Sequence, residues 1–287
     1  MKPPSQAGRP LHLKEQASGS RVASPVAAVR ARRPARPGFR GQLSIWSAGI
    51  VLALAGGCQL GSWDSPGWRT VFGSGKVVTE SRTVHGFHQV AISGSGQLII
   101  ESGDAESLAI TGDDNLLPLI RSEVQGGKLE IGPRQVALRP SQSIRYHLFI
   151  RQLDVLSISG AVHVQAGELR GQRLTLDLSG SSHVEIGRLD VDALEVGISG
   201  SGRIQAAGKA RQQTVRISGS GDYLAGDLQS DRAEIAVSGS AHATLWVDRA
   251  LSARISGSGQ VRYRGRPAIE SHVSGSGRID PSDTVER

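Results

Sequence analysis

Residues 196–204, VGISGSGRI, decide the fold, because this stretch recurs along the chain with little change. Its signature, Ile-Ser-Gly-Ser-Gly or a near variant, places its first serine at eight positions: Ser93, Ser159, Ser179, Ser199, Ser218, Ser238, Ser256 and Ser274. Successive separations are 66, 20, 20, 19, 20, 18 and 18 residues. Self-similarity at a fixed period is typical of architectures in which each repeat stacks on its neighbours.

The residues around each signature alternate between apolar and polar. A branched aliphatic precedes every signature serine: Ile92, Ile158, Leu178, Ile198, Ile217, Val237, Ile255 and Val273. Alternation that stops at a Gly-rich corner and then resumes indicates strand, turn and strand. Glycine supplies the positive φ of such a corner, and serine hydroxyls can bond to the turn backbone.

A coil of 18–20 residues has room for about three short strands. Coils stacked about 4.8 Å apart would align the aliphatic residues in an apolar interior, with Ile198 and Ile217 buried in adjacent coils. The sequence therefore predicts an all-β solenoid, a single-stranded parallel β-helix of ten or so coils about 50 Å long. We expect coils without the signature to fill the 66-residue gap. The competing sandwich or barrel has strands every 8–12 residues but requires no repeated corner.

Composition and charge narrow the function classes. The 287 residues include 37 Gly, 11 aromatic residues and one Cys, which excludes a disulfide framework and a cysteine-based zinc site. The net charge of +7 belongs to residues 1–57, which hold nine basic residues and one acid. Residues 58–287 hold 24 basic and 25 acidic residues, so we expect no nucleic-acid partner.

The N-terminal segment has the pattern of an export signal. Basic residues precede the uncharged stretch 43–55, LSIWSAGIVLALA, which at thirteen residues is shorter than the roughly 20 of a membrane span. The following Gly56-Gly57-Cys58 resembles a bacterial lipobox, which implies lipidation of Cys58; the alternative is a buried free thiol in an uncleaved anchor. Gln59 in place of Asp favours the outer membrane. We predict a signal segment at 1–57, a linker at 58–71, a β-helical domain at 72–280 and a tail at 281–287.

Several further motifs carry a family resemblance. They are 73–78 (GSGKVV), 87–90 (FHQV), 113–118 (DDNLLP), 127–131 (GKLEI), the repeated corners and 261–265 (VRYRG). In this order and spacing, the chain resembles the auto-transporter adhesin head GIN family of bacterial envelope proteins. The resemblance implies a right-handed single-stranded β-helix from about residue 72 to 280, and it implies no catalytic residues.

Other chemistry is weakly supported. The Gly-rich stretches 73–76 and 219–222 lack the following helix of a phosphate loop, and the Gly-Gly-x-Gly-x-Asp calcium motif does not recur. The fourth residue after each signature serine is polar and should face outward. That column would place His163 beside His183, but two histidines without a third ligand make a poor metal site.

An enzyme is the principal alternative function. Polysaccharide-cleaving enzymes need carboxylates clustered on one face, whereas alternation places Asp190 and Asp192, near Glu195, on a solvated edge. No serine is set apart as a nucleophile. We therefore expect a non-catalytic, lipid-anchored cell-envelope protein for binding, adhesion or envelope architecture, without cofactor or metal. Its expected partners are the membrane and a glycan or other envelope component.

Overall fold

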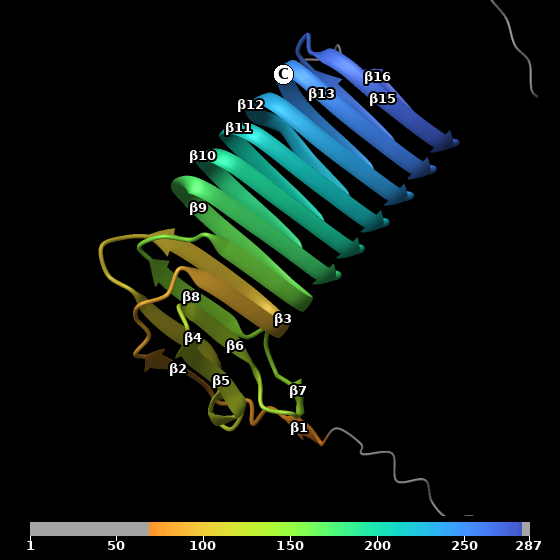
Figure 1. Ribbon diagram of the computed structural model, residues 1–287. Coiled ribbons are helices and arrows are strands. Elements are labelled where there is room, and N and C mark those ends of the chain that lie inside the picture. Colours follow the sequence, from red (N-terminus) through yellow and green to blue (C-terminus); the bar gives the residue numbers. More distant parts are fainter. Residues whose placement is uncertain (1–68, 283–287) are drawn as a thin grey trace, which may run out of the picture. The chain divides into compact units, whose positions relative to one another are not determined.

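The computed structural model describes residues 69–282, which lie within the compact unit Ser62–Arg287 (Figure 1). In this range the only helix is the short 3-10 helix η1 (Leu117–Leu119). The first strands are β1 (Thr70–Phe72), β2 (Val77–Arg82), β3 (Gln89–Ser102), β4 (Ser107–Asp113), β5 (Ile120–Gln125), β6 (Lys128–Pro133), β7 (Ala137–Arg139) and β8 (Arg145–Ile150). The later strands are β9 (Val155–Gly180), β10 (His183–Gly200), β11 (Arg203–Gly219), β12 (Asp222–Gly239), β13 (His242–Gly257), β14 (Gln260–Arg264), β15 (Ala268–Gly275) and β16 (Arg278–Pro281).

Strands β9 to β13 stack in chain order, each parallel to the one before it (Figure 1). The register follows the sequence repeat, because Ser199 pairs with Ser179 on one side and with Ser218 on the other. The predicted single-stranded parallel β-helix is confirmed, in about six turns.

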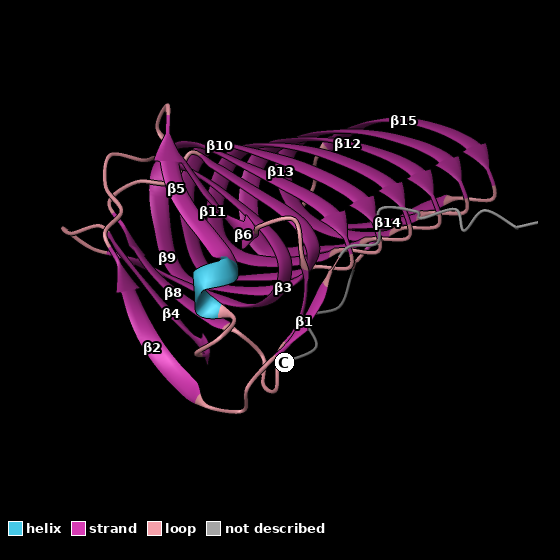
Figure 2. Ribbon diagram, turned by 90° about the horizontal axis from the view of Figure 1, so that it is seen from below, coloured by secondary structure: helices cyan, strands magenta, loops and turns pink. Residues whose placement is uncertain are grey.

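Each coil is one continuous ribbon that bends around the interior (Figure 2). In β10 the buried residues alternate along three short runs, and the alternation breaks at residues 187–188 and 192–193, where two successive residues are not buried. The runs contribute these inward side chains: Val184, Ile186, Leu189, Val191, Leu194, Val196 and Ile198. Three runs per coil agree with the expectation of about three short strands, and the pairing with β11 is interrupted at both bends, by a register shift between Ile186 and Leu189 and by an unpaired Asp192.

The corners need glycine for two reasons, as Gly219 illustrates. Its φ of +121° is accessible to glycine and strained for other residues. In addition, a Cβ atom at Gly219 would lie 2.5 Å from the carbonyl oxygen of Gly200 in the preceding coil. That oxygen accepts a hydrogen bond of 2.9 Å from the Ser220 N–H, so the corners are bonded directly on top of one another.

The interior is a set of aligned apolar columns. Ile198 and Ile217 are paired in register and each is 2% exposed, as predicted. Tyr223 occupies the same kind of inward position, where burial raises its pKa. Its hydroxyl donates a 2.7 Å hydrogen bond to the buried side-chain oxygen of Gln213, so the one polar atom of this aromatic side chain is satisfied.

The 66-residue gap does not contain about three regular coils, so the expectation of ten or so coils is wrong. Ser93 of β3 pairs directly with Ser159 of β9, which makes the two signatures neighbours despite their separation in sequence. Strands β6 and β8 form one incomplete rung beneath β3. The rest of the gap forms β4 and β5, which pair antiparallel with β8 and β6, and β2 pairs antiparallel with β4. Of these antiparallel pairs only β5 and β6 form a hairpin, whereas β2, β4 and β8 pair across intervening strands.

The opposite end of the stack has no such cover within residues 69–282. There β15 pairs only with β13, and β16 pairs only with β14. Ile269 and Val273 continue the interior columns of Leu251 and Ile255, but they are 44% and 41% exposed, whereas Leu251 and Ile255 are 1% and 2% exposed. The last rung is therefore open.

Cys58, the predicted signal segment and residues 283–287 lie outside the described residues. Between residues 69 and 282, no helix is long and apolar enough to cross a membrane.

Candidate functional site

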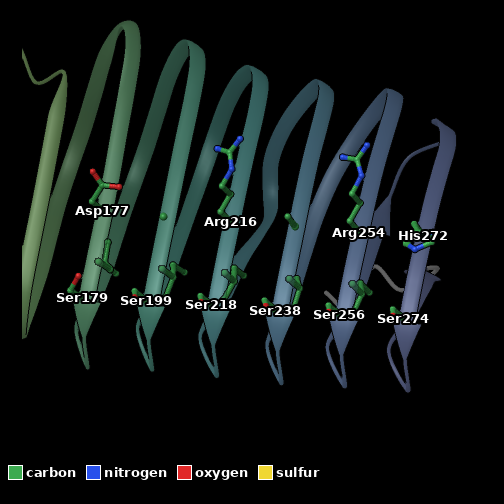
Figure 3. Close-up of a pocket in the computed structure, with 17 residues that line it drawn as sticks. Asp177, Ser179, Ser199, Arg216, Ser218, Ser238, Arg254, Ser256, His272 and Ser274 are labelled. Atoms are coloured by element: carbon green, nitrogen blue, oxygen red, sulfur yellow. The ribbon is translucent and has the colours of Figure 1, made fainter. Parts of the chain in front are cut away.

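An elongated groove runs along the outside of the stack beside the glycine corners (Figure 3). One part, of about 800 Å³, extends from Asp177 on β9 to Ser274 on β15, and a second, of about 280 Å³, extends from there towards β3 and β6. Both parts are lined by Asp177 and Ser179, so they are continuous. We call the whole the serine groove, because all eight signature serines line it: Ser93, Ser159, Ser179, Ser199, Ser218, Ser238, Ser256 and Ser274.

The signature hydroxyls are available to a ligand. Within residues 69–282, the only side-chain hydrogen bond that a signature serine donates is the 3.4 Å contact from Ser93 to the carbonyl oxygen of Ile131. The turn backbone is instead satisfied by bonds between successive corners, such as the 2.9 Å bond from Ser201 N–H to the Gly180 oxygen. None of the eight signature hydroxyls therefore bonds to the backbone of its own corner; the expected bond to corner backbone is made instead by Ser182, whose hydroxyl donates to the Gly160 oxygen of the preceding corner at 3.1 Å.

A second column, two residues before each serine, gives the groove its varied wall. Its members are Ala91, Ser157, Asp177, Gly197, Arg216, Ala236, Arg254 and His272. From Asp177 to Arg254 long and short side chains alternate, and Gly197 and Ala236, the register partners of Arg216 in the two neighbouring coils, leave space on either side of it. Figure 3 shows the long side chains of Arg216 and Arg254 along this wall. This column was not singled out from the sequence, although aligning the repeats on their serines would have displayed it.

Charges are distributed unevenly along this wall. The Arg254 guanidinium is 3.1 Å from a carboxylate oxygen of Glu234 in the preceding coil. Arg216 forms no ion pair with the described part of the chain. The Asp177 carboxylate lies against Gly197, where an added Cβ would be 2.8 Å from its oxygen. The groove therefore presents the Arg216 cation near its middle and, two coils away, the Asp177 carboxylate, both beside a row of hydroxyls.

The outward column of fourth residues is confirmed as a surface ladder. His163 and His183 stack with ring centroids 5.0 Å apart, and His183 Nε2 lies 2.9 Å from Glu185 Oε1. Further along, the Arg203 guanidinium is 2.7 Å from the Asp222 carboxylate. Among residues 69–282, no group of three or more His, Cys, Asp or Glu side chains is arranged to hold a metal ion.

The Gly-rich stretch 73–76 is a clasp at the capped end of the stack. The buried Asp113 carboxylate accepts hydrogen bonds from the Gly75 N–H (2.8 Å) and from the N–H (2.9 Å) and hydroxyl of Ser141. The bonds from Ser141, first that of its hydroxyl, lower the pKa of Asp113. Next to it, Asp114 accepts a 2.6 Å bond from the Ser74 hydroxyl. The Gly75 N–H and the Ser74 hydroxyl thus bond to carboxylates of the 113–118 motif and not to a ligand. This contact explains why the 73–76 and 113–118 motifs occur together.

The acids considered for catalysis lie apart from the groove. Asp192 is 3.2 Å from Arg211 and Glu195 is 3.8 Å from Arg173, each across neighbouring coils, and Asp190 is exposed. Such exposed pairs contribute little to stability and keep the surface mixed in charge. They form cross-coil charge ladders on the predicted solvated edge.

The fold and the groove define a single-chain parallel β-solenoid with an open groove, lined by the signature serines together with aliphatic side chains such as Ile198, Ile217 and Ile255. The chain belongs to the family described as "Putative auto-transporter adhesin, head GIN domain", whose model matches residues 86–267. The resemblance seen in the sequence is thus confirmed. A comparison with curated proteins found no match.

Solved structures share the fold. A protein from Bacteroides fragilis described as "a putative adhesin" is 22% identical, with a TM-score of 0.70 over 74% of this chain and 100% of that chain. A "putative lipid binding protein" from Parabacteroides distasonis is 24% identical, with a TM-score of 0.61 over 75% and 100%. A "putative adhesin" from Parabacteroides merdae is 21% identical, with a TM-score of 0.58 over 75% and 100%.

Proposed function

We propose that this protein is a non-catalytic, lipid-anchored component of the cell envelope whose serine groove binds an extended acidic glycan. In this proposal residues 1–57 direct export, Cys58 carries the lipid and residues 58–71 link it to the β-helical domain at 72–280, with a tail at 281–287. The observation that carries the binding role is the continuous groove, in which seven of the eight signature hydroxyls donate no hydrogen bond within residues 69–282.

The dimensions of the groove suit a linear polymer. Eight rungs at about 4.8 Å give a length of about 34 Å. The hydroxyls repeat at that same spacing, so each successive sugar would meet a donor and an acceptor. A compact ligand would use only a fraction of this surface, and a branched one would meet the long side chains of Arg216 and Arg254.

The charge of the wall favours negatively charged ligands. Arg216 lies in the middle of the groove without an ion-pair partner in the described chain, and a guanidinium recognises carboxylates in a bidentate manner. Arg254 and His272 add donors towards the open end. Uronic acid residues would supply matching carboxylates, whereas a neutral glycan would leave Arg216 unused.

The carboxylates of the groove do not support glycosidic cleavage. Glu130 lies beneath Ala91 on the β6 rung, and Asp177 lies three rungs further along the same column. Three rungs correspond to about 14 Å, whereas glycosidases hold their two carboxylates about 5–10 Å apart. Glu130 is also bound by Arg121 and Lys128, each at 3.1 Å.

Binding is tested with the full chain in detergent micelles, using polygalacturonate as the acidic probe and dextran as the neutral one. We expect polygalacturonate alone to bind, Arg216→Ala to weaken binding about tenfold, and Ala236→Trp to block the groove. Ala193→Trp is the matched control, because Ala193 is also a half-buried alanine of the outer surface but does not line the groove. Equal binding by the two tryptophan variants, or binding to phospholipid vesicles in place of the glycan, would contradict the proposal.

The anchor is tested separately by the intact mass of the protein extracted from membranes. Each buried methylene of an acyl chain is worth about 0.8 kcal/mol, so two or three chains suffice to hold the domain on a membrane. We expect a mature chain that begins at a lipidated Cys58 and fractionates with the outer membrane, and we expect Cys58→Ser to abolish the added mass. A free thiol at Cys58 in the membrane-extracted wild type would refute the anchor and leave the groove proposal intact.

A further inference from the structure

The open rung at the C-terminal end of the stack exposes a strand edge and apolar side chains that are buried in the other coils. All eight residues of β15 are exposed, although their partners in β13 include the buried Leu251, Ala253 and Ile255. An exposed strand edge with apolar side chains is a template for pairing with another strand. Solenoids generally need a cap at each end for this reason.

The other end of the stack is already closed by the chain itself. Leu116, Leu117 and Ile120 are 0–1% exposed there, and β2 and β4 pair antiparallel beyond the last parallel rung. The outermost strand β2 carries Glu80 and Arg82, whose side chains are 3.2 Å apart. In a head-to-tail stack, the open rung of one copy would face the charged strand β2 of the next, which does not match its apolar side chains.

Strand β15 can pair with a second copy of itself in one self-complementary register. Its sequence is Ala-Ile-Glu-Ser-His-Val-Ser-Gly over residues 268–275. If Ser271 lies opposite Ser271 of the second copy in an antiparallel pair, Ile269 faces Val273 and Glu270 faces His272. The alternation is correct as well, because 269, 271 and 273 continue the inward columns while 270 and 272 point outward.

We propose that two copies of this protein join at their C-terminal ends through antiparallel pairing of β15, centred on Ser271. The pairing is isologous, so it closes at two copies and leaves no further edge to grow from. The pairing joins the sheets of the two solenoids into one continuous sheet and covers Ile269 and Val273 of both copies. Two polar pairs also form, as the Glu270 carboxylate of each copy faces the His272 imidazole of the other.

Strand β16 does not offer an equivalent edge. It is four residues long, carries Arg278 and Asp280, and ends at Pro281, which has no N–H to donate to a neighbouring strand. Short, charged strands that contain proline are typical protection against edge pairing. The contrast with the unprotected β15 identifies β15 as the pairing strand.

The first test measures the mass of the full chain in density-matched detergent by sedimentation equilibrium. We expect a dimer for the wild type and a rise in dissociation constant of about 100-fold or more for the double variant Ile269→Lys/Val273→Lys, which places four charges in the interface. The matched control is Val77→Lys, because Val77 is a similarly exposed apolar residue, at 38%, on the edge strand of the capped end. It should leave the dimer unchanged.

The second test fixes the register. Ser271→Cys should form an intermolecular disulfide on mild oxidation, because directly opposed residues of an antiparallel pair bring their Cβ atoms within about 4.5–5.5 Å. Ser240→Cys, on the exposed corner between β12 and β13, is the control and should stay monomeric on a non-reducing gel. A monomeric wild type would overturn the proposal. Dissociation by Val77→Lys, open-ended oligomers, or equal cross-linking of the two cysteine variants would also overturn it.

Discussion

Replacing Gly219 with alanine tests the stacked corner that organises the whole solenoid. An alanine there must adopt a φ near +121°, which costs about 1–3 kcal/mol for a residue with a side chain. Its Cβ would approach the Gly200 oxygen to 2.5 Å, so the two coils must separate locally. This separation weakens the 2.9 Å hydrogen bond from Ser220 N–H to the same oxygen, worth about 1 kcal/mol. We expect a total loss of about 2–4 kcal/mol.

The matched control is Gly167→Ala in β9. Gly167 does not have a left-handed backbone, and a Cβ atom there would meet nothing within 4 Å. Restricting the unfolded chain should make this variant neutral or more stable by up to about 1 kcal/mol. The assay is urea unfolding of the two variants and the wild type, followed by far-UV circular dichroism and linear extrapolation. If Gly219→Ala proved as mild as Gly167→Ala, close corner stacking would not be the reason for the repeated glycine.

The remaining predictions concern the interior and the clasp. Ile217→Asp should destabilise the protein by about 4 kcal/mol or more in urea unfolding, since it places an unpaired charge in an apolar column. Arg203→Ala, on the surface ladder, should cost less than about 1 kcal/mol. Equal effects would mean that the inward and outward columns are misassigned. Because the pKa of Asp113 is lowered on folding from its usual 3.8, its stabilisation is complete above that pH and is lost as the pH falls through the folded-state value. Asp113→Asn should therefore lower the thermal midpoint at pH 7 and do so progressively less as the pH falls below about 4; a difference that does not change with pH would count against the carboxylate.

The regular coils could be predicted because each corner carries the same conformational and steric demands. Ser199 and Gly200 pair in register with the same residues of both neighbouring coils, so the spacing between successive signatures equals the length of one coil. In the 66-residue gap the number of residues does not give the number of coils, because an insertion of any length can leave the stack at one corner and rejoin it at the next. Ser93 pairs with Ser159 across an insertion whose strands β4 and β8 also pair over a long separation in sequence, and no repeated residue marks either pairing.

The candidate site was only half visible in the sequence. The serines were evident as repeated residues, but repetition alone did not distinguish a structural hydroxyl from an available one. The distinction comes from the backbone, since the corner N–H and C=O groups bond to one another and do not need the signature hydroxyls as hydrogen-bond partners. Arg216 and Asp177 were not recognised, because their column has no common residue type and its importance lies in the alternation of long and short side chains.

The in-register corner also makes the coil a unit of evolutionary change. Because Ser199 and Ser218 occupy equivalent places, removing the 19 residues 199–217 would join two ends that already have the same geometry, and every remaining coil would keep a neighbour of the same shape. Duplication of such a segment would add a rung by the same logic. Selection can therefore lengthen or shorten the serine groove in steps of about 4.8 Å without redesigning either end of the molecule.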